Sequence, residues 1–198
     1  MTKFLLIRHA TTDTVGKKLS GRTAGVHLNE KGKAQAQELA KKLANTSIAA
    51  IYSSPLERAV ETAEPIATTH QLEIFINNNF LEIDFGAWTN ASFETLQNEK
   101  QFQLFNSFRS ATRIPGGELM LEAQARIVAG MQQLCIQHPD ETVAIVSHAD
   151  LIKAAITYYA GIHLDLFQRI EISPASVNIV EVYEETARVM LVNGGGEL

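Results

Sequence analysis

The sequence has very little cysteine: Cys135 is the one cysteine among 198 residues. A single thiol excludes an intrachain disulfide and any zinc site built on cysteine pairs. No apolar run approaches the ~18 residues of a membrane-spanning helix, and the first residues lack the pattern of a signal peptide. We therefore expect a cytoplasmic protein without a membrane partner, in which Cys135 is a buried structural thiol.

The sequence also lacks an excess of positive charge. It has 17 lysines and arginines against 22 aspartates and glutamates, which gives a formal net charge of −5. This balance does not favour nucleic acid as a partner, so an anion site has to be a local cluster of cations. Hydrophobic residues make up 45% of the chain, which suits a single domain over residues 1–198.

Short apolar runs alternate with helical patterns along the chain. Asn29 is a typical N-cap residue, and alanine and leucine spacing continues from it to about Ala44. Such alternation favours an α/β fold with a largely parallel, buried sheet. Strands are expected at 3–8, 48–54, 72–77, 142–148 and in a closing hairpin of 176–184 and 187–195, and helices at 28–44, 54–70, 117–138 and 149–161.

Polar residues stand where three of these strands end. Arg8 and His9 follow the first strand, Ser54 follows the second, and Ser147 and His148 follow a later one. In open α/β sheets, ligands bind beyond the carboxyl ends of the strands. If the three strands are parallel neighbours, these side chains meet at one edge of the sheet.

The stretch "SSPLERAVETA" has the pattern of a helix start. Ser54 is the expected N-cap, Pro55 the first helical residue and Glu57 the capping-box partner. Arg58 then lies about one turn into the helix, where a cation opposes the positive end of the helix dipole. Either an anion binds between Arg58 and the helix start, or Arg58 is a surface residue offset by Glu57 and Glu61.

The residue types at this edge suit phosphoryl chemistry. Arg8 and Arg58 offer planar forks that match phosphate oxygens. Two histidines near neutral pH can divide the work, one attacking phosphorus while neutral and the other donating while charged. Glu82 follows an apolar stretch that would raise its pKa and suit a proton donor. Spacing alone leaves an alternative open for each of these residues. His9 and His148 could be structural histidines, and Glu82 could be an ordinary loop carboxylate.

Four stretches carry a resemblance to a known family: "LIRHATT", "YSSPLERAVETA", "LEIDFGAW" and "VAIVSHADLI". In this order they resemble the histidine phosphatase superfamily, whose fold is shared by cofactor-dependent phosphoglycerate mutases and many small phosphatases. The resemblance implies a phosphohistidine intermediate on His9, with Arg8, Arg58 and His148 holding the phosphoryl group. It implies Glu82 as general acid and then general base, no metal or cofactor, and a three-layer α/β/α sandwich with a mostly parallel sheet.

The chain departs from the family pattern after His9. Ala10 stands where the family usually has glycine, and we expect it to be tolerated because the need there is for a backbone carbonyl that orients the imidazole. Thr11 replaces the usual glutamate or glutamine, and Val15 lies near the place of a common asparagine. Phosphate or substrate binding is further assigned to Thr12, Arg22 and Ala149.

The segment between the carboxylate and the second histidine bears on the reaction. Residues 83–147 form a short interval by comparison with the lid of glycolytic mutases, so we expect hydrolysis of a small phosphomonoester ahead of mutase activity. A small helical lid insertion is expected over about 86–118. Arg109 and Arg113 have i, i+4 spacing and could face a second anionic group or solvent. Lid aromatics that line the site or pack on helices are Trp88, Phe93, Phe102, Phe105 and Phe108.

Two readings from other classes stay open. His9, Asp13, His148 and Asp150 are metal-ligand types, which would suit a metal-dependent phosphoesterase. The chain could instead be a module that binds phosphoesters without catalysis. The apolar closing hairpin offers an edge for a homodimer, and the substrate itself is not identified.

Overall fold

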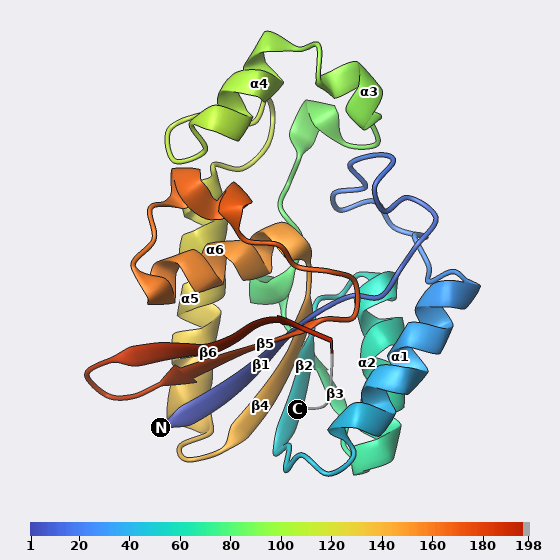
Figure 1. Ribbon diagram of the computed structural model, residues 1–198, viewed down its shortest axis with the longest axis vertical. Coiled ribbons are helices and arrows are strands. Elements are labelled where there is room, and N and C mark those ends of the chain that lie inside the picture. Colours follow the sequence, from blue (N-terminus) through green and yellow to red (C-terminus); the bar gives the residue numbers. More distant parts are fainter. Residues whose placement is uncertain (196–198) are drawn as a thin grey trace.

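A six-stranded sheet lies in the middle of the molecule, whose computed structural model describes residues 1–195 (Figure 1). The strand order is β3-β2-β4-β1-β5-β6. The pairs β3–β2, β2–β4 and β4–β1 are parallel, whereas β5 and β6 extend the sheet as an antiparallel hairpin. The strands are β1 (Thr2–Arg8), β2 (Ala50–Ser53), β3 (Ile74–Ile76), β4 (Thr142–Ser147), β5 (Val177–Val182) and β6 (Ala187–Gly194).

Helices cover both faces of the sheet. Along β1, Leu5 and Ile7 pack in the cluster that contains α1 (Glu30–Leu43) and α2 (Glu57–His70). Phe4 and Leu6 belong to the opposite cluster, with α5 (Met120–Gln137) and α6 (Ala149–Ala160). This alternation follows from the two-residue period of a strand. The predicted three-layer α/β/α sandwich is confirmed, and no helix within residues 1–195 is long and apolar enough to cross a membrane.

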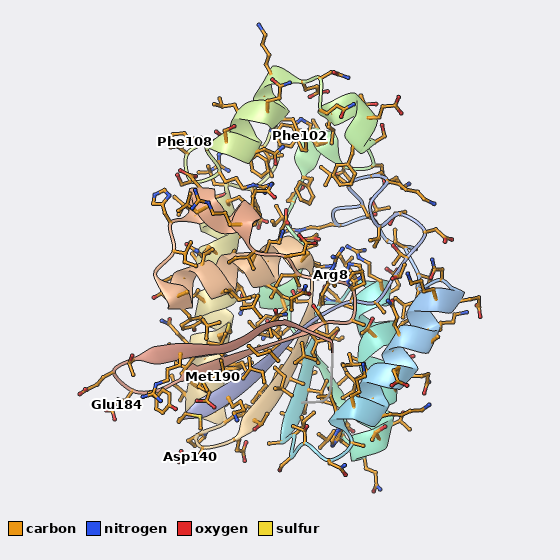
Figure 2. The ribbon with its side chains drawn as sticks, viewed as in Figure 1. Arg8, Phe102, Phe108, Asp140, Glu184 and Met190 are labelled. Atoms are coloured by element: carbon orange, nitrogen blue, oxygen red, sulfur yellow. The ribbon has the colours of Figure 1, made fainter. Side chains whose placement is uncertain are left out.

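The predicted insertion forms a separate cap at the top of the view in Figure 1. It contains η2 (Gly86–Trp88), α3 (Phe93–Leu96) and α4 (Lys100–Ser107). Two further 3-10 helices, η1 (Asn78–Phe80) and η3 (Leu164–Arg169), lie outside this insertion. Trp88 and Phe105 are buried and their rings stack edge to face 5.3 Å apart, so packing is their role. Phe102 packs against Trp88, whereas Phe108 is half exposed (Figure 2).

The expectation that Arg109 and Arg113 share a helix face is wrong. Helix α4 ends at Ser107, because Phe108 adopts a non-helical backbone (φ −143°, ψ 63°). Arg109 is buried against α6, while Arg113 is exposed and pairs with Glu122 of α5.

The predicted start of α2 is also wrong. The helix begins at Glu57 with Leu56 as its N-cap residue, so Arg58 is its second residue. Ser54 is not the N-cap residue: its hydroxyl shares a hydrogen bond of 2.8 Å with His148 and accepts at 3.4 Å from the backbone N–H of Leu56. The Glu57 carboxylate accepts from the backbone N–H of Gly25 rather than closing a capping box.

Helix α1 begins as predicted and packs closely on the chain that follows β1. The Asn29 side chain accepts from the backbone N–H of Gly32 at 2.9 Å, and Asn29 itself donates its backbone N–H to the Thr11 carbonyl. A Cβ on Gly32 would lie 2.1 Å from that carbonyl oxygen. Glycine at position 32 therefore lets the helix start touch the backbone two residues beyond His9.

Gly32→Ala should destabilise the protein, although alanine is the better helix former by ~1 kcal/mol. The neighbour is backbone and has little freedom to yield, so we expect a net loss of about 1–3 kcal/mol in the free energy of unfolding. Denaturant unfolding beside Gly195→Ala, where a Cβ meets open space, is the measurement. An unchanged or raised midpoint for Gly32→Ala would contradict the close approach.

Candidate active site

His9 is fixed in one tautomer at the end of β1. Its Nδ1–H donates to the carbonyl oxygen of Ala10 at 2.8 Å, which leaves Nε2 unprotonated. Burial, helped by the charge of Arg58, lowers the pKa of His9 to about 3. Ala10 does not have the positive φ angle that would favour glycine, so alanine occupies this position without backbone strain.

Arg8 and Arg58 are cations with donor atoms to spare. Arg8 Nη1 donates to the Ile172 carbonyl at 2.6 Å, and Arg58 Nη2 donates to the Gly21 carbonyl at 2.7 Å. Within residues 1–195, Arg8 Nε and Arg58 Nη1 are buried without a hydrogen-bond partner, and neither arginine has a carboxylate within ion-pair distance. Burial lowers the pKa of both guanidinium groups. Such unpaired cations favour an anion between them.

His148 faces His9 from the end of β4. The two imidazole centroids lie 5.3 Å apart, and His148 Nε2 and Ser54 Oγ share a hydrogen bond of 2.8 Å. Burial and then the charge of Arg58 lower the pKa of His148 well below its ordinary value, so the ring is neutral in the protein alone. The charged donor expected from the sequence therefore has to form when an anion arrives.

Glu82 supplies a carboxyl group beside His148. Glu82 Oε2 lies 3.7 Å from His148 Nδ1, and Oε1 accepts from the backbone N–H of Ile83. Burial, together with the nearby charge of Asp150 and against the opposing charge of Arg58, raises the pKa of Glu82 to about 7. A carboxyl group that titrates near neutrality can give a proton and later take one.

Four of these residues, Arg8, His9, Arg58 and Glu82, line one cavity of about 140 Å³. Arg8 lies between the sheet and the cap in the view of Figure 2. Thr12 and Ala149 also line it, as the sequence analysis expects of phosphate-binding residues. Lys18 and Gly21, from the loop that follows β1, and Asp150 also line the cavity.

Arg22 lies behind Glu82. Its Nε donates to the Glu82 carbonyl at 2.8 Å, and its Nη2 donates to Glu118 at 2.8 Å. The other oxygen of Glu118 accepts from the Asp84 backbone and from Arg126 of α5. Arg22 thus secures the backbone of the acid rather than lining the cavity.

The metal-ligand residue types do not gather. Within the described part of the chain, no three side chains among histidine, cysteine, aspartate and glutamate come together as metal ligands. Asp13 accepts from Asn29, and Asp150 pairs with Arg109. The arrangement concentrates cations instead, which suits an anionic substrate.

A protein-family model described as "Histidine phosphatase superfamily (branch 1)" matches residues 4–194. The chain belongs to the histidine phosphatase superfamily. The resemblance carried by the four sequence stretches is therefore confirmed, and its similar proteins include one named as a phosphatase and one named as phosphoglycerate mutase-like.

Two curated relatives align along nearly the whole chain. The chain is 33% identical over 202 residues to "Bifunctional protein Rv2228c" of Mycobacterium tuberculosis, with 100% of this chain and 55% of that protein covered. It thus spans about half the length of that relative. It is 28% identical to "Phosphoserine phosphatase 1" of Hydrogenobacter thermophilus, with 98% of this chain and 92% of that protein covered.

Solved structures show the same fold. Bacillus stearothermophilus YhfR superposes with a TM-score of 0.92 at 27% identity and covers 100% of this chain and 99% of its own. A phosphoserine phosphatase mutant of Entamoeba histolytica, in complex with phosphoserine, has a TM-score of 0.88 at 26% identity and covers 98% and 97%. The phosphoglycerate mutase-like architecture is thereby confirmed.

Two contacts of the site differ from what the sequence indicates. Ser54 is expected both at this edge of the sheet and as a helix cap, and in the structure its hydroxyl bonds His148. Asp150 is expected as a metal-ligand type, whereas it pairs with Arg109. The partner lies 41 residues away, so no local spacing signals this pair.

Arg58→Met should separate binding from stability. Losing one charged hydrogen bond to phosphate costs about 1.5–3 kcal/mol, so affinity for inorganic phosphate should fall roughly 10- to 100-fold. The free energy of unfolding should not fall, because the change removes a buried cation that lacks a carboxylate partner.

Titration calorimetry and thermal unfolding measure the two effects. Arg188→Met, a change on β6 where the arginine lies over Tyr183, is the matched control and should leave phosphate binding unaltered. Undiminished phosphate affinity in Arg58→Met would contradict the assignment of an anion site.

Proposed function

We propose that this protein hydrolyses a small phosphomonoester through a phosphohistidine on His9. The observation that carries this proposal is the unprotonated Nε2 of His9 beside arginine donors that have no partner among residues 1–195. Nε2 attacks phosphorus, the phosphorus–oxygen bond to the alcohol breaks, and Glu82 gives its proton to the leaving oxygen. Glu82, now a carboxylate, takes a proton from water as the water oxygen attacks phosphorus and the phosphorus–nitrogen bond breaks.

Arg8, Arg58 and His148 hold the transferring group in this proposal. The charge that spreads over the phosphoryl oxygens in the transition state meets fixed donors, which is the largest contribution to such catalysis. An arriving dianion offsets the repulsion among these cations and favours protonation of His148. The binding step thereby prepares the donor that the transfer step uses.

The relatives bear on the choice between hydrolysis and mutase activity. The phosphoserine phosphatase relative is matched over 92% of its own length, which supports water as the acceptor and phosphoserine as a first substrate to test. A mutase would return the phosphoryl group to a second hydroxyl of a substrate. The interval between Glu82 and His148 is short for a lid that excludes water, which also favours hydrolysis.

The first test is phosphate release in EDTA from p-nitrophenyl phosphate, phosphoserine, phosphoglycerates and sugar phosphates. Wild type should release phosphate, and His9→Ala should release none above background because the attacking nitrogen is absent. His138→Ala, a histidine at the far end of the sheet, should behave as wild type. Equal release by wild type and His9→Ala would overturn the phosphohistidine, and isomerised phosphoesters without release would indicate a mutase.

The pH dependence should follow Glu82. The pKa of Glu82 is raised to about 7, so its proton is present below that pH and is lost as the pH rises through it. With an alkyl phosphate, kcat/KM should therefore fall above about pH 7. Glu82→Gln should slow alkyl phosphates by roughly 10²–10⁴-fold.

p-Nitrophenyl phosphate supplies the control, since its leaving group needs no proton. Glu82→Gln should keep a rapid first release of p-nitrophenolate while steady turnover slows, because the second step still needs a base. Equal loss of the rapid release and of alkyl phosphate turnover would contradict Glu82 as the acid.

A further inference from the structure

The pocket contains a carboxylate that an anion site does not need. Asp150 lies at the start of α6, lines the cavity together with Arg8 and Glu82, and has a side chain that is 26% exposed. A negative charge there opposes an incoming phosphate dianion. An acidic residue in the first turn stabilises a helix. Asp150 therefore stabilises α6, while its charge disfavours the binding of an anion in the cavity.

Arg109 offsets this charge from the cap. Its Nη1 lies 3.4 Å from Asp150 Oδ2, and its side chain is 5% exposed. The guanidinium carbon lies 4.4 Å from the centroid of Phe105 on α4 and 4.2 Å from that of Phe167 on η3. Two aromatic faces hold the plane of the cation, and Arg109 Nη2 donates to Asn106 at 2.6 Å.

The backbone beside Arg109 is tied down independently. The Ser110 N–H and hydroxyl donate to the two carboxylate oxygens of Asp165 on η3, at 2.7 and 3.1 Å. Figure 1 shows α4 above the segment that contains η3. Arg109 is thus fixed from α4, η3 and α6 together, which exceeds what a solvent-facing ion pair needs.

We propose that Arg109 is a positioning residue that neutralises Asp150 and so keeps the cavity receptive to phosphate. It touches no reacting atom and acts through Asp150. The inference rests on the proposed function for its role in turnover, whereas its effect on phosphate binding is measurable without turnover.

The same pair bears on the acid. Glu82 is faced by Arg58 from α2, Arg8 from β1, His148 from the end of β4 and Asp150 from α6, and Arg22 of the loop contacts its backbone. Arg126 of α5 lies nearby and also lowers the pKa of His148. Asp150 is the negative group in this set, and Arg109 is its counter-ion. Without Arg109, Glu82 should keep its proton to higher pH.

The test is a double-mutant cycle read by calorimetric binding of inorganic phosphate. Arg109→Gln should weaken binding roughly tenfold, because a partly buried carboxylate near the anion loses its counter-ion. Asp150→Asn should bind at least as tightly as wild type. Arg109→Gln/Asp150→Asn should return to within about twofold of wild type, which is the non-additivity expected of directly coupled groups.

Arg113→Gln is the matched control. It removes the same charge four residues along the chain, where the arginine is exposed and pairs with Glu122, and it should leave phosphate binding unchanged. If Arg109→Gln does not fold, the double variant is compared with Asp150→Asn, and the two should bind phosphate equally. Additive losses in Arg109→Gln and in the double variant, which a merely structural Arg109 would cause, overturn the proposal.

Turnover separates this proposal from the proposed function. In an active enzyme, Arg109→Gln should raise KM more than it lowers kcat and should shift the alkaline limb of kcat/KM upward, and Asp150→Asn should reverse both. If wild type binds phosphate but has no activity, and the double-mutant cycle gives the expected affinities, the proposed hydrolysis is wrong and the role of Arg109 stands. If wild type is active and Arg109→Gln has an unchanged KM, only the role of Arg109 is wrong.

Discussion

Buried positive charge without an ion-pair partner among residues 1–195, at the edge where the parallel strands end, is the constraint on which the rest of this structure depends. Within residues 1–195, Arg8 and Arg58 retain donor atoms without protein partners, and the imidazoles of His9 and His148 face each other nearby. Such a cluster costs folding free energy unless the surroundings hold it in place. The apolar clusters on both faces of the sheet supply that stability. The protein carries a locally unfavourable arrangement that an anion relieves.

This constraint explains why the site spans so many elements. His9 follows β1, His148 follows β4, Arg58 is the second residue of α2, and Glu82 follows η1. The parallel order β2-β4-β1 brings three of these positions to one edge. Contacts that are long in sequence, such as His148 with Ser54, fix the side chains there. A site on one loop would lack this rigidity.

The sequence predicts the strands, the layers and the meeting of Arg8, His9, Arg58, Glu82 and His148, because strand ends and helix starts leave local patterns. The prediction is wrong where a side chain has two possible hydrogen-bond partners. Ser54 has the pattern of a helix cap, but its hydroxyl bonds His148 at the end of the neighbouring strand. Arg109 has helical spacing to Arg113, but the helix stops at Ser107. Both outcomes depend on contacts over 40 residues or more, which no short window contains.

The hydrogen bonds around Arg22 carry a further consequence. Arg22 belongs to the loop that borders the cavity, yet it also grips the main chain of Glu82 and, through Glu118, joins that backbone to α5. Changes in this loop that reshape the cavity would also move the carboxyl group of Glu82. The shape of the cavity and the position of this carboxyl group are therefore coupled in this chain, and a substitution that alters one also alters the other.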